Sequence, residues 1–75
     1  MLKVKVKAND IERLLAKRNL SHNAFATRLS ISSGYMSQLV RGERYPSADL
    51  RAKILRSLRG VGFDDIFEVV DDGGD

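Results

Sequence analysis

An all-α fold, with four to five helices packed into one small domain, is the class that the sequence predicts. Apolar residues recur at intervals of three and four along most of residues 9 to 59, the spacing of helices with one buried face. Residues that favour helix starts precede these segments, and glycine follows two of them. The 75 residues fit a single domain, which we assign to residues 1 to 70.

The N-terminal segment breaks this pattern. Residues 2 to 7 read Leu-Lys-Val-Lys-Val-Lys, a period of two that is typical of a strand. A single strand is not stable alone, and the best partner is a short antiparallel pairing with about residues 67 to 70, which would oppose the lysines with Glu68. Residues 63 to 70 also fit a one-turn helix capped by Asp64. Two alternatives follow: a sheet within the chain, or a strand edge that pairs with a second copy.

The outer helices follow from their caps and apolar stripes. The first is predicted from about Asp10 to Arg18, with Asn9 or Asp10 as its cap. The last begins after Pro46, with Ser47 as its cap, and stops at the glycines 60 and 62. Their predicted buried faces are Ile11, Leu14 and Leu15 in the first helix, and Leu50, Ile54, Leu55 and Leu58 in the last.

Residues 22 to 42 predict two short helices joined by a tight turn. Ser21 caps the first helix, Ser32 or Ser33 caps the second, and Gly42 ends it. The apolar positions expected to face inward are Phe25, Ala26, Leu29, Met36, Leu39 and Val40. This is the pattern of a helix-turn-helix, in which the second helix protrudes and fits the major groove of DNA.

The outward face of residues 33 to 41 suits base recognition. It carries uncharged hydrogen-bonding groups and one terminal arginine, where an ordinary solvated helix would be rich in Glu and Lys. The amide of Gln38 can both donate to and accept from an adenine edge. The predicted base contacts are Ser33, Gly34, Ser37 and Gln38.

Charge is distributed unevenly along the chain. Residues 1 to 63 hold all 13 Lys and Arg against four acids, a net charge of +9, whereas residues 64 to 75 hold six acids and no base. A body this basic is typical of proteins that bind a phosphate backbone. Residues 71 to 75 contain no hydrophobic residue and are predicted to form an acidic disordered tail.

Three short motifs carry a resemblance to a known family. They are Phe25-Ala26-x-x-Leu29-x-Ile31-Ser32, Met36-Ser37-x-Leu39, and Arg41-Gly42-x-Arg44-x-Pro46-Ser47 followed by Leu50. On these motifs, residues 10 to 67 resemble the Cro and phage-repressor type of helix-turn-helix regulator, also called the xenobiotic-response-element family.

The resemblance assigns roles to several positions. The residue matching Ala26 lets the two helices approach closely, the one matching Ile31 plugs the turn into the core, and the one matching Leu39 anchors the recognition helix. The family usually has Gly where this chain has Ser30, and a non-glycine residue in a left-handed turn costs about 1 kcal/mol. It often has Gln where this chain has His22.

Residues around the recognition helix are predicted to hold the DNA backbone. His22 begins a helix, where an anion can bind, and the loop after the recognition helix brings amides and cations toward the sugar-phosphate chain. For Tyr35 the alternatives are a contact with DNA and cover for the core edge, and for the loop residues a solvated surface. The predicted backbone contacts are His22, Tyr35, Arg41, Arg44, Tyr45 and Arg51.

The sequence thus predicts a cytoplasmic, repressor-like transcriptional regulator that binds double-stranded DNA as a homodimer. No metal site is expected, since the chain has no cysteine and one histidine. No membrane association is expected, because no apolar run approaches the roughly 20 residues of a membrane span. Neither a cofactor nor a small-molecule ligand is indicated. Enzyme activity is not expected, because no catalytic arrangement or glycine-rich phosphate loop is present. The alternative function is a protein-interaction module, antitoxin-like or DNA-mimicking, that works through the acidic C-terminal segment.

Overall fold

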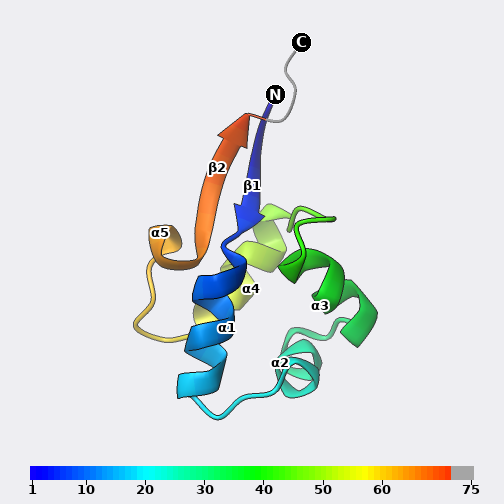
Figure 1. The fold of residues 1–75 in the computed structure, drawn as a ribbon, viewed down its shortest axis with the longest axis vertical. Helices are drawn as coiled ribbons and strands as arrows, with labels where there is room; N and C mark the ends of the chain where they lie inside the picture. Colours follow the sequence, from blue (N-terminus) through cyan, green and yellow to red (C-terminus); the bar gives the residue numbers. More distant parts are fainter. Residues whose placement is uncertain (72–75) are drawn as a thin grey trace.

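Five helices and a two-stranded antiparallel sheet make up the fold in a computed structural model, which describes residues 1–71 (Figure 1). The elements are β1 Leu2–Val6, α1 Ala8–Lys17, α2 His22–Leu29, α3 Ser33–Val40, α4 Ala48–Ser57, α5 Phe63–Ile66 and β2 Phe67–Asp71. The predicted all-α class is therefore wrong, because the molecule is a small mixed α/β domain. The short pairing of the two end segments, which that prediction left open, is present.

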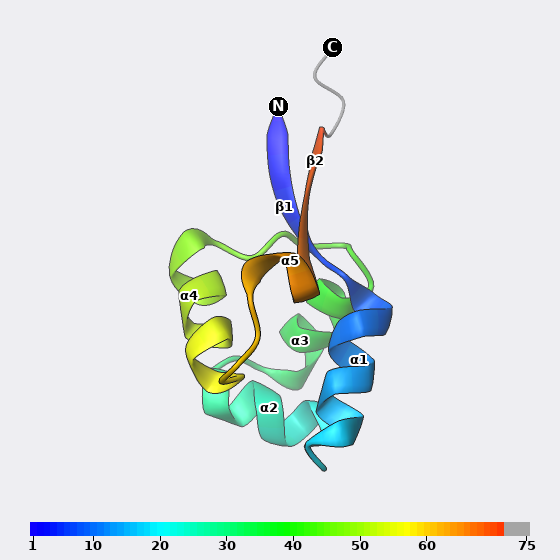
Figure 2. The same ribbon diagram turned by 90° about the vertical axis from the view of Figure 1, so that its left-hand side faces the viewer.

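The two strands form a ribbon that projects from the helices, as both views show (Figures 1 and 2). β1 pairs with β2 so that Val6 lies opposite Phe67 and Lys5 lies opposite Glu68. At the far end Leu2 lies opposite Asp71, whose Oδ1 accepts a hydrogen bond of 3.0 Å from the N-terminal ammonium. Asp71, which we assigned to the tail, is therefore a strand residue, while residues 72 to 75 lie outside the described part of the chain.

The core is built from one apolar stripe of each helix and the inner end of the ribbon. The inward residues predicted for α2 and α3 are all buried, whereas Leu14, Leu50 and Leu55 are partly buried. Val6 and Phe67 carry the ribbon into this core. The buried residues are Val6, Ile11, Leu15, Phe25, Ala26, Leu29, Met36, Leu39, Val40, Ile54, Leu58, Ile66 and Phe67.

Three serines begin the helices that surround the turn. The hydroxyls of Ser21, Ser32 and Ser47 each accept a hydrogen bond from the backbone N–H three residues further on, at 3.0 to 3.2 Å. These caps satisfy amides that have no partner within the helix. They fix the starts of α2, α3 and α4 at the positions that the sequence predicted, with Ser32 as the cap of α3.

The first and fifth helices begin differently from the prediction. The residue before α1 is Lys7, whose side chain makes no capping bond, so neither Asn9 nor Asp10 is the cap. For α5 the cap is Gly62 in place of Asp64, and its N–H donates to Asp65 Oδ2 at 2.8 Å. β1 leads into α1 through Lys7 and so sets where α1 starts, whereas α5 runs directly into β2, which sets where α5 ends.

The turn between α2 and α3 contains a serine in a left-handed conformation. Ser30 has φ 59° and ψ 39°, and its N–H donates to Thr27 O at 3.1 Å. The side chain of Ile31 packs against the core from the next position. A non-glycine residue is strained in this left-handed conformation, as the sequence predicted for Ser30.

Replacing Ser30 with glycine is therefore expected to raise the free energy of unfolding by up to about 1 kcal/mol, because glycine removes the left-handed penalty while giving the unfolded chain more freedom. Urea unfolding measures the change. Ala24→Gly is the matched control, since Ala24 lies in right-handed α2 and the same residue should there lower stability by about 1 kcal/mol. A lower stability in Ser30→Gly would contradict the assignment of strain to this turn.

Within the described residues, every helix is too short or too polar to cross a membrane.

Candidate nucleic-acid interface

Helix α3 is buried on one side only. Met36, Leu39 and Val40 pack into the core, and α2 and β1 contact the helix. Of the four predicted base-contact residues, Ser33 and Gly34 are exposed at the start of the helix, and Ser37 and Gln38 are half-buried on its next turn. The four therefore line a short polar face that two turns of helix present outward.

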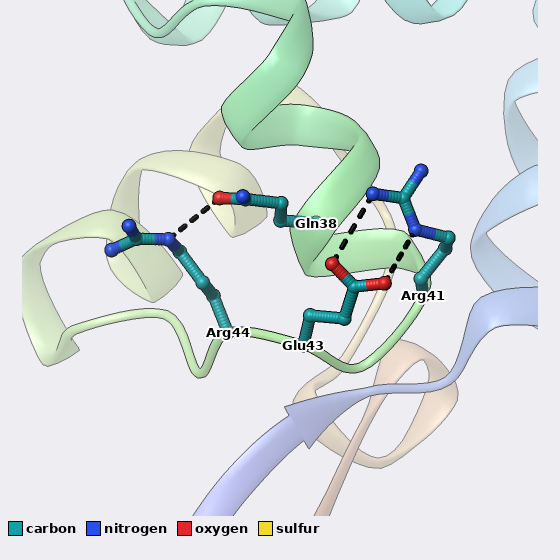
Figure 3. A network of polar contacts seen from close by, with 4 residues as sticks. All are labelled: Gln38, Arg41, Glu43 and Arg44. Carbon is teal, nitrogen blue, oxygen red and sulfur yellow. Dashed lines mark hydrogen bonds and ion pairs between the residues drawn. The ribbon is translucent and has the colours of Figure 1, made fainter.

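Gln38 is held by the loop that follows α3. Arg44 Nε donates to Gln38 Oε1 at 2.6 Å, and the Arg44 backbone N–H donates to the Gln38 carbonyl at 3.3 Å (Figure 3). The Arg44 guanidinium also lies over the Tyr35 ring, with its central carbon 5.3 Å from the ring centroid. The three side chains form one cluster, in which the Gln38 oxygen already accepts a hydrogen bond and its amide nitrogen can donate to a ligand.

Arg41 forms an ion pair with Glu43 on the opposite side of the α3 C-terminus (Figure 3). The guanidinium binds both carboxylate oxygens, Nε to Oε2 at 2.8 Å and Nη2 to Oε1 at 3.2 Å. The hydrogen bonds and charge of this pair lower the pKa of Glu43 and raise that of Arg41, so both groups are charged at neutral pH. A phosphate that binds Arg41 must therefore compete with a carboxylate.

The fold makes this loop possible through one residue. Gly42 has φ +79°, the left-handed conformation that the sequence predicted at the end of this helix. A Cβ at Gly42 would meet no atom within 4 Å, so the backbone conformation, and not crowding, favours glycine there. The chain thereby turns back along α3 and places Arg44 beside Gln38.

The remaining predicted contacts lie in different settings. His22 begins α2, and its Nε2 lies 3.4 Å from Glu12 Oε1 of α1. Arg51 Nη1 donates to Pro46 O at 2.9 Å in a partly buried position, where it holds the start of α4. Tyr45 is exposed in the α3–α4 loop, and Lys3 Nζ lies over its ring, 5.7 Å from the ring centroid of Tyr45.

Two kinds of residue near this surface were not predicted from the sequence. Glu12 and Glu43 place carboxylates beside predicted phosphate ligands, and Lys3 joins the loop from the ribbon. Glu43 is two residues from Arg41, so the sequence carried a signal for that pair. Nothing in the spacing of Lys3 and Tyr45 pointed to their contact, because it depends on where the ribbon sits.

Comparison of the chain with protein-family models, with curated proteins and with solved structures finds no match. Residues 1–71 hold no group of three or more His, Cys, Asp or Glu side chains arranged to bind a metal ion. The geometry and charge of the surface around α3 are therefore the observations from which a function can be inferred.

Proposed function

We propose that the protein is a helix-turn-helix regulator of transcription, which binds specific sites in double-stranded DNA and acts as a repressor. The observation that carries the proposal is the polar face of α3, from Ser33 to Gln38, which is uncharged and has an arginine on each side of its C-terminal end. An α-helix fits the major groove, where hydroxyl and amide groups can bind base edges and flanking cations can bind phosphates.

The roles divide along the surface. Ser33, Gly34, Ser37 and Gln38 read base edges, while Arg41 and Arg44, with His22, Tyr35 and Tyr45, contact the sugar-phosphate backbone. Arg51 acts more weakly, because its guanidinium already binds the Pro46 carbonyl. The protein works in the cytoplasm without a cofactor, as a dimer on DNA, since a single helix of this length contacts few base pairs.

The interaction-module alternative has less support. It needs a free acidic surface, but Glu68 Oε1 lies 3.5 Å from Lys5 Nζ, and Asp71 binds the N-terminal ammonium. Two of the acids in the described part of the C-terminal segment are thus already paired within the ribbon. In contrast, residues 1 to 63, which include α3, hold 13 basic residues against four acids, so most of their positive charge has no acidic partner available.

Selection of binding sites from random duplex DNA tests the proposal directly. The expected result is enrichment of a sequence with two-fold symmetry, to which two chains bind in sedimentation experiments. The protein should also bind random duplex DNA at low salt. No enrichment of any sequence, with no retention of random duplex at low salt, would reject DNA binding. An enriched site without symmetry, saturated by one chain, would reject the dimer alone.

A further inference from the structure

The ribbon has one basic face. Alternation along β1 puts Lys3 and Lys5 on one side and Leu2, Val4 and Val6 on the other. The register places the two lysines opposite Val70 and Glu68, so this face, which we call the lysine face, holds two cations and one acid. The acid is 3.5 Å from Lys5 Nζ, with both side chains more than 40% exposed, so its charge offsets only part of the basic surface.

The lysine face continues the surface around α3. The ammonium of Lys3 lies over the ring of Tyr45, a residue of the loop that also carries Arg44. β1 contacts α3, and the ribbon rises beside the α3–α4 loop in Figure 1. A polyanion bound along this loop would therefore meet Lys3 next.

A groove joins the two surfaces. It lies between the end of β1, the start of α1 and the end of α3, and Lys5, Lys7 and Arg41 line it together with one acid, Asp10. Lys7 Nζ donates to the Asp64 carbonyl of α5 at 2.8 Å, an uncharged acceptor, so the lysine keeps its positive charge. Three basic residues thus line the groove where the ribbon meets α3, and two of them, Lys5 and Arg41, would exchange an exposed carboxylate partner for phosphate.

We propose that the lysine face and this groove bind the phosphate backbone of the duplex beside the segment that α3 reads. The inference rests on the proposed function and adds a second contact region to it. A five-residue strand spans roughly 17 Å, which matches about five base pairs of duplex DNA. The ribbon therefore extends the bound length of DNA without reading its sequence.

A second copy of the chain fits this face poorly. Pairing β1 with β1 of another copy would bring the lysines of one strand close to those of the other, and like charges across a strand pair are destabilising. DNA supplies the opposite charge at regular spacing.

The test uses the full chain with Lys3 and Lys5 both changed to Gln. The matched control changes Lys17 and Arg56 to Gln, which removes the same charge from exposed positions on α1 and α4, away from the ribbon (Figure 1). Binding is measured from 50 to 200 mM salt on two duplexes that share the selected site, one ending at the site and one extended by about ten base pairs on each side. Circular dichroism and thermal melting establish that both variants are folded.

We expect the wild type and the control to bind the long duplex more tightly than the short one, and the Lys3/Lys5 variant to lose that gain. Its slope of log affinity against log salt on the long duplex should be smaller by about two units, so that its deficit at 50 mM is about tenfold larger than at 200 mM. Replacing Glu68 with Gln should have the opposite effect and tighten binding of the long duplex.

Three other outcomes would each overturn the inference. A Lys3/Lys5 variant that matches the control on both duplexes shows that the ribbon does not bind DNA. A variant with weaker self-association and unchanged DNA affinity per chain assigns the face to a second copy instead. If the wild type binds no duplex, the proposed function fails as well. If the wild type binds its site specifically and the Lys3/Lys5 variant behaves like the control, only the ribbon contact is rejected.

Discussion

Phe67→Ala is expected to lower the free energy of unfolding by about 3–5 kcal/mol, the usual cost of removing a buried phenylalanine ring. Phe67 is fully buried at the junction of α5 and β2, opposite Val6, with its ring centroid 5.2 Å from that of Phe63. A domain of this size is stable by only about 4–11 kcal/mol, so the variant should lose a large fraction of its stability. Urea denaturation followed by circular dichroism measures the change.

Val69→Ala is the matched control for this experiment. Val69 lies on the same face of β2 two residues further along, but it is 55% exposed. Its loss of strand propensity and partial packing should lower stability by less than about 1 kcal/mol. Equal losses from the two variants would contradict the view that the ribbon is held to the helices by the residues at its inner end.

The helices around the turn could be predicted because local signals agree there. Serine caps mark the starts of α2, α3 and α4, and the apolar stripe of each short helix faces the core. The start of α1 was wrong for a reason that lies outside the helix. The backbone N–H of Lys7 donates to the Ile66 carbonyl at 2.7 Å, so the strand pairing, and not an Asn9 or Asp10 cap, determines where the helix begins.

The predicted fold class was wrong because it was based on the helical periodicity of most of the sequence, and the two strands are short. β1 and β2 have five residues each and lie at opposite ends of the described chain, so their pairing depends on a contact that no local window contains. Alternation revealed β1 and suggested its partner. The inclusion of Asp71 in β2 follows from Leu2 opposite it and from its ion pair with the N-terminus, both of which are contacts between distant residues.

At the candidate interface, the sequence placed the outward face of α3 but not the contacts between its side chains. The Gln38–Arg44 hydrogen bond and the Arg41–Glu43 ion pair both depend on how the chain turns at Gly42. Periodicity predicts the helix face on which a residue lies. The partner of a long side chain depends also on the course of the loop next to it, which periodicity does not predict. The proposed base contacts and backbone contacts are therefore not independent, because Gln38 of the first group is hydrogen-bonded to Arg44 of the second.

Gln38→Ala is expected to weaken binding to the selected site by about 1–3 kcal/mol and to leave binding to random duplex almost unchanged, because the amide contacts a base edge while Arg44, which contacts phosphate, is still held over the Tyr35 ring. Fluorescence anisotropy titrations on selected and random duplexes over a salt series measure both affinities. A loss of equal size on both duplexes would contradict the assignment of α3 as the element that reads sequence.

Arg44→Ala should weaken binding to random duplex and reduce the salt slope by about one unit, as expected for one lost phosphate contact. The structure adds an effect that the sequence did not predict. Since Arg44 Nε holds Gln38 Oε1 at 2.6 Å, removing the arginine also frees the Gln38 amide to rotate. Arg44→Ala should therefore lose more affinity on the selected site than on random DNA.

The double variant Gln38→Ala/Arg44→Ala separates these two effects. Once Gln38 is absent, Arg44 has no amide to orient, so the two losses on the selected site should sum to more than the loss in the double variant, by about 0.5–3 kcal/mol. On random duplex the two losses should be additive. The matched control pairs Gln38→Ala with Arg41→Ala, because Arg41 binds Glu43 and not Gln38, and it should be additive on both duplexes. If Arg44 and Arg41 give the same additive result, Arg44 contacts phosphate only, and Gln38 reads its base without help from the loop.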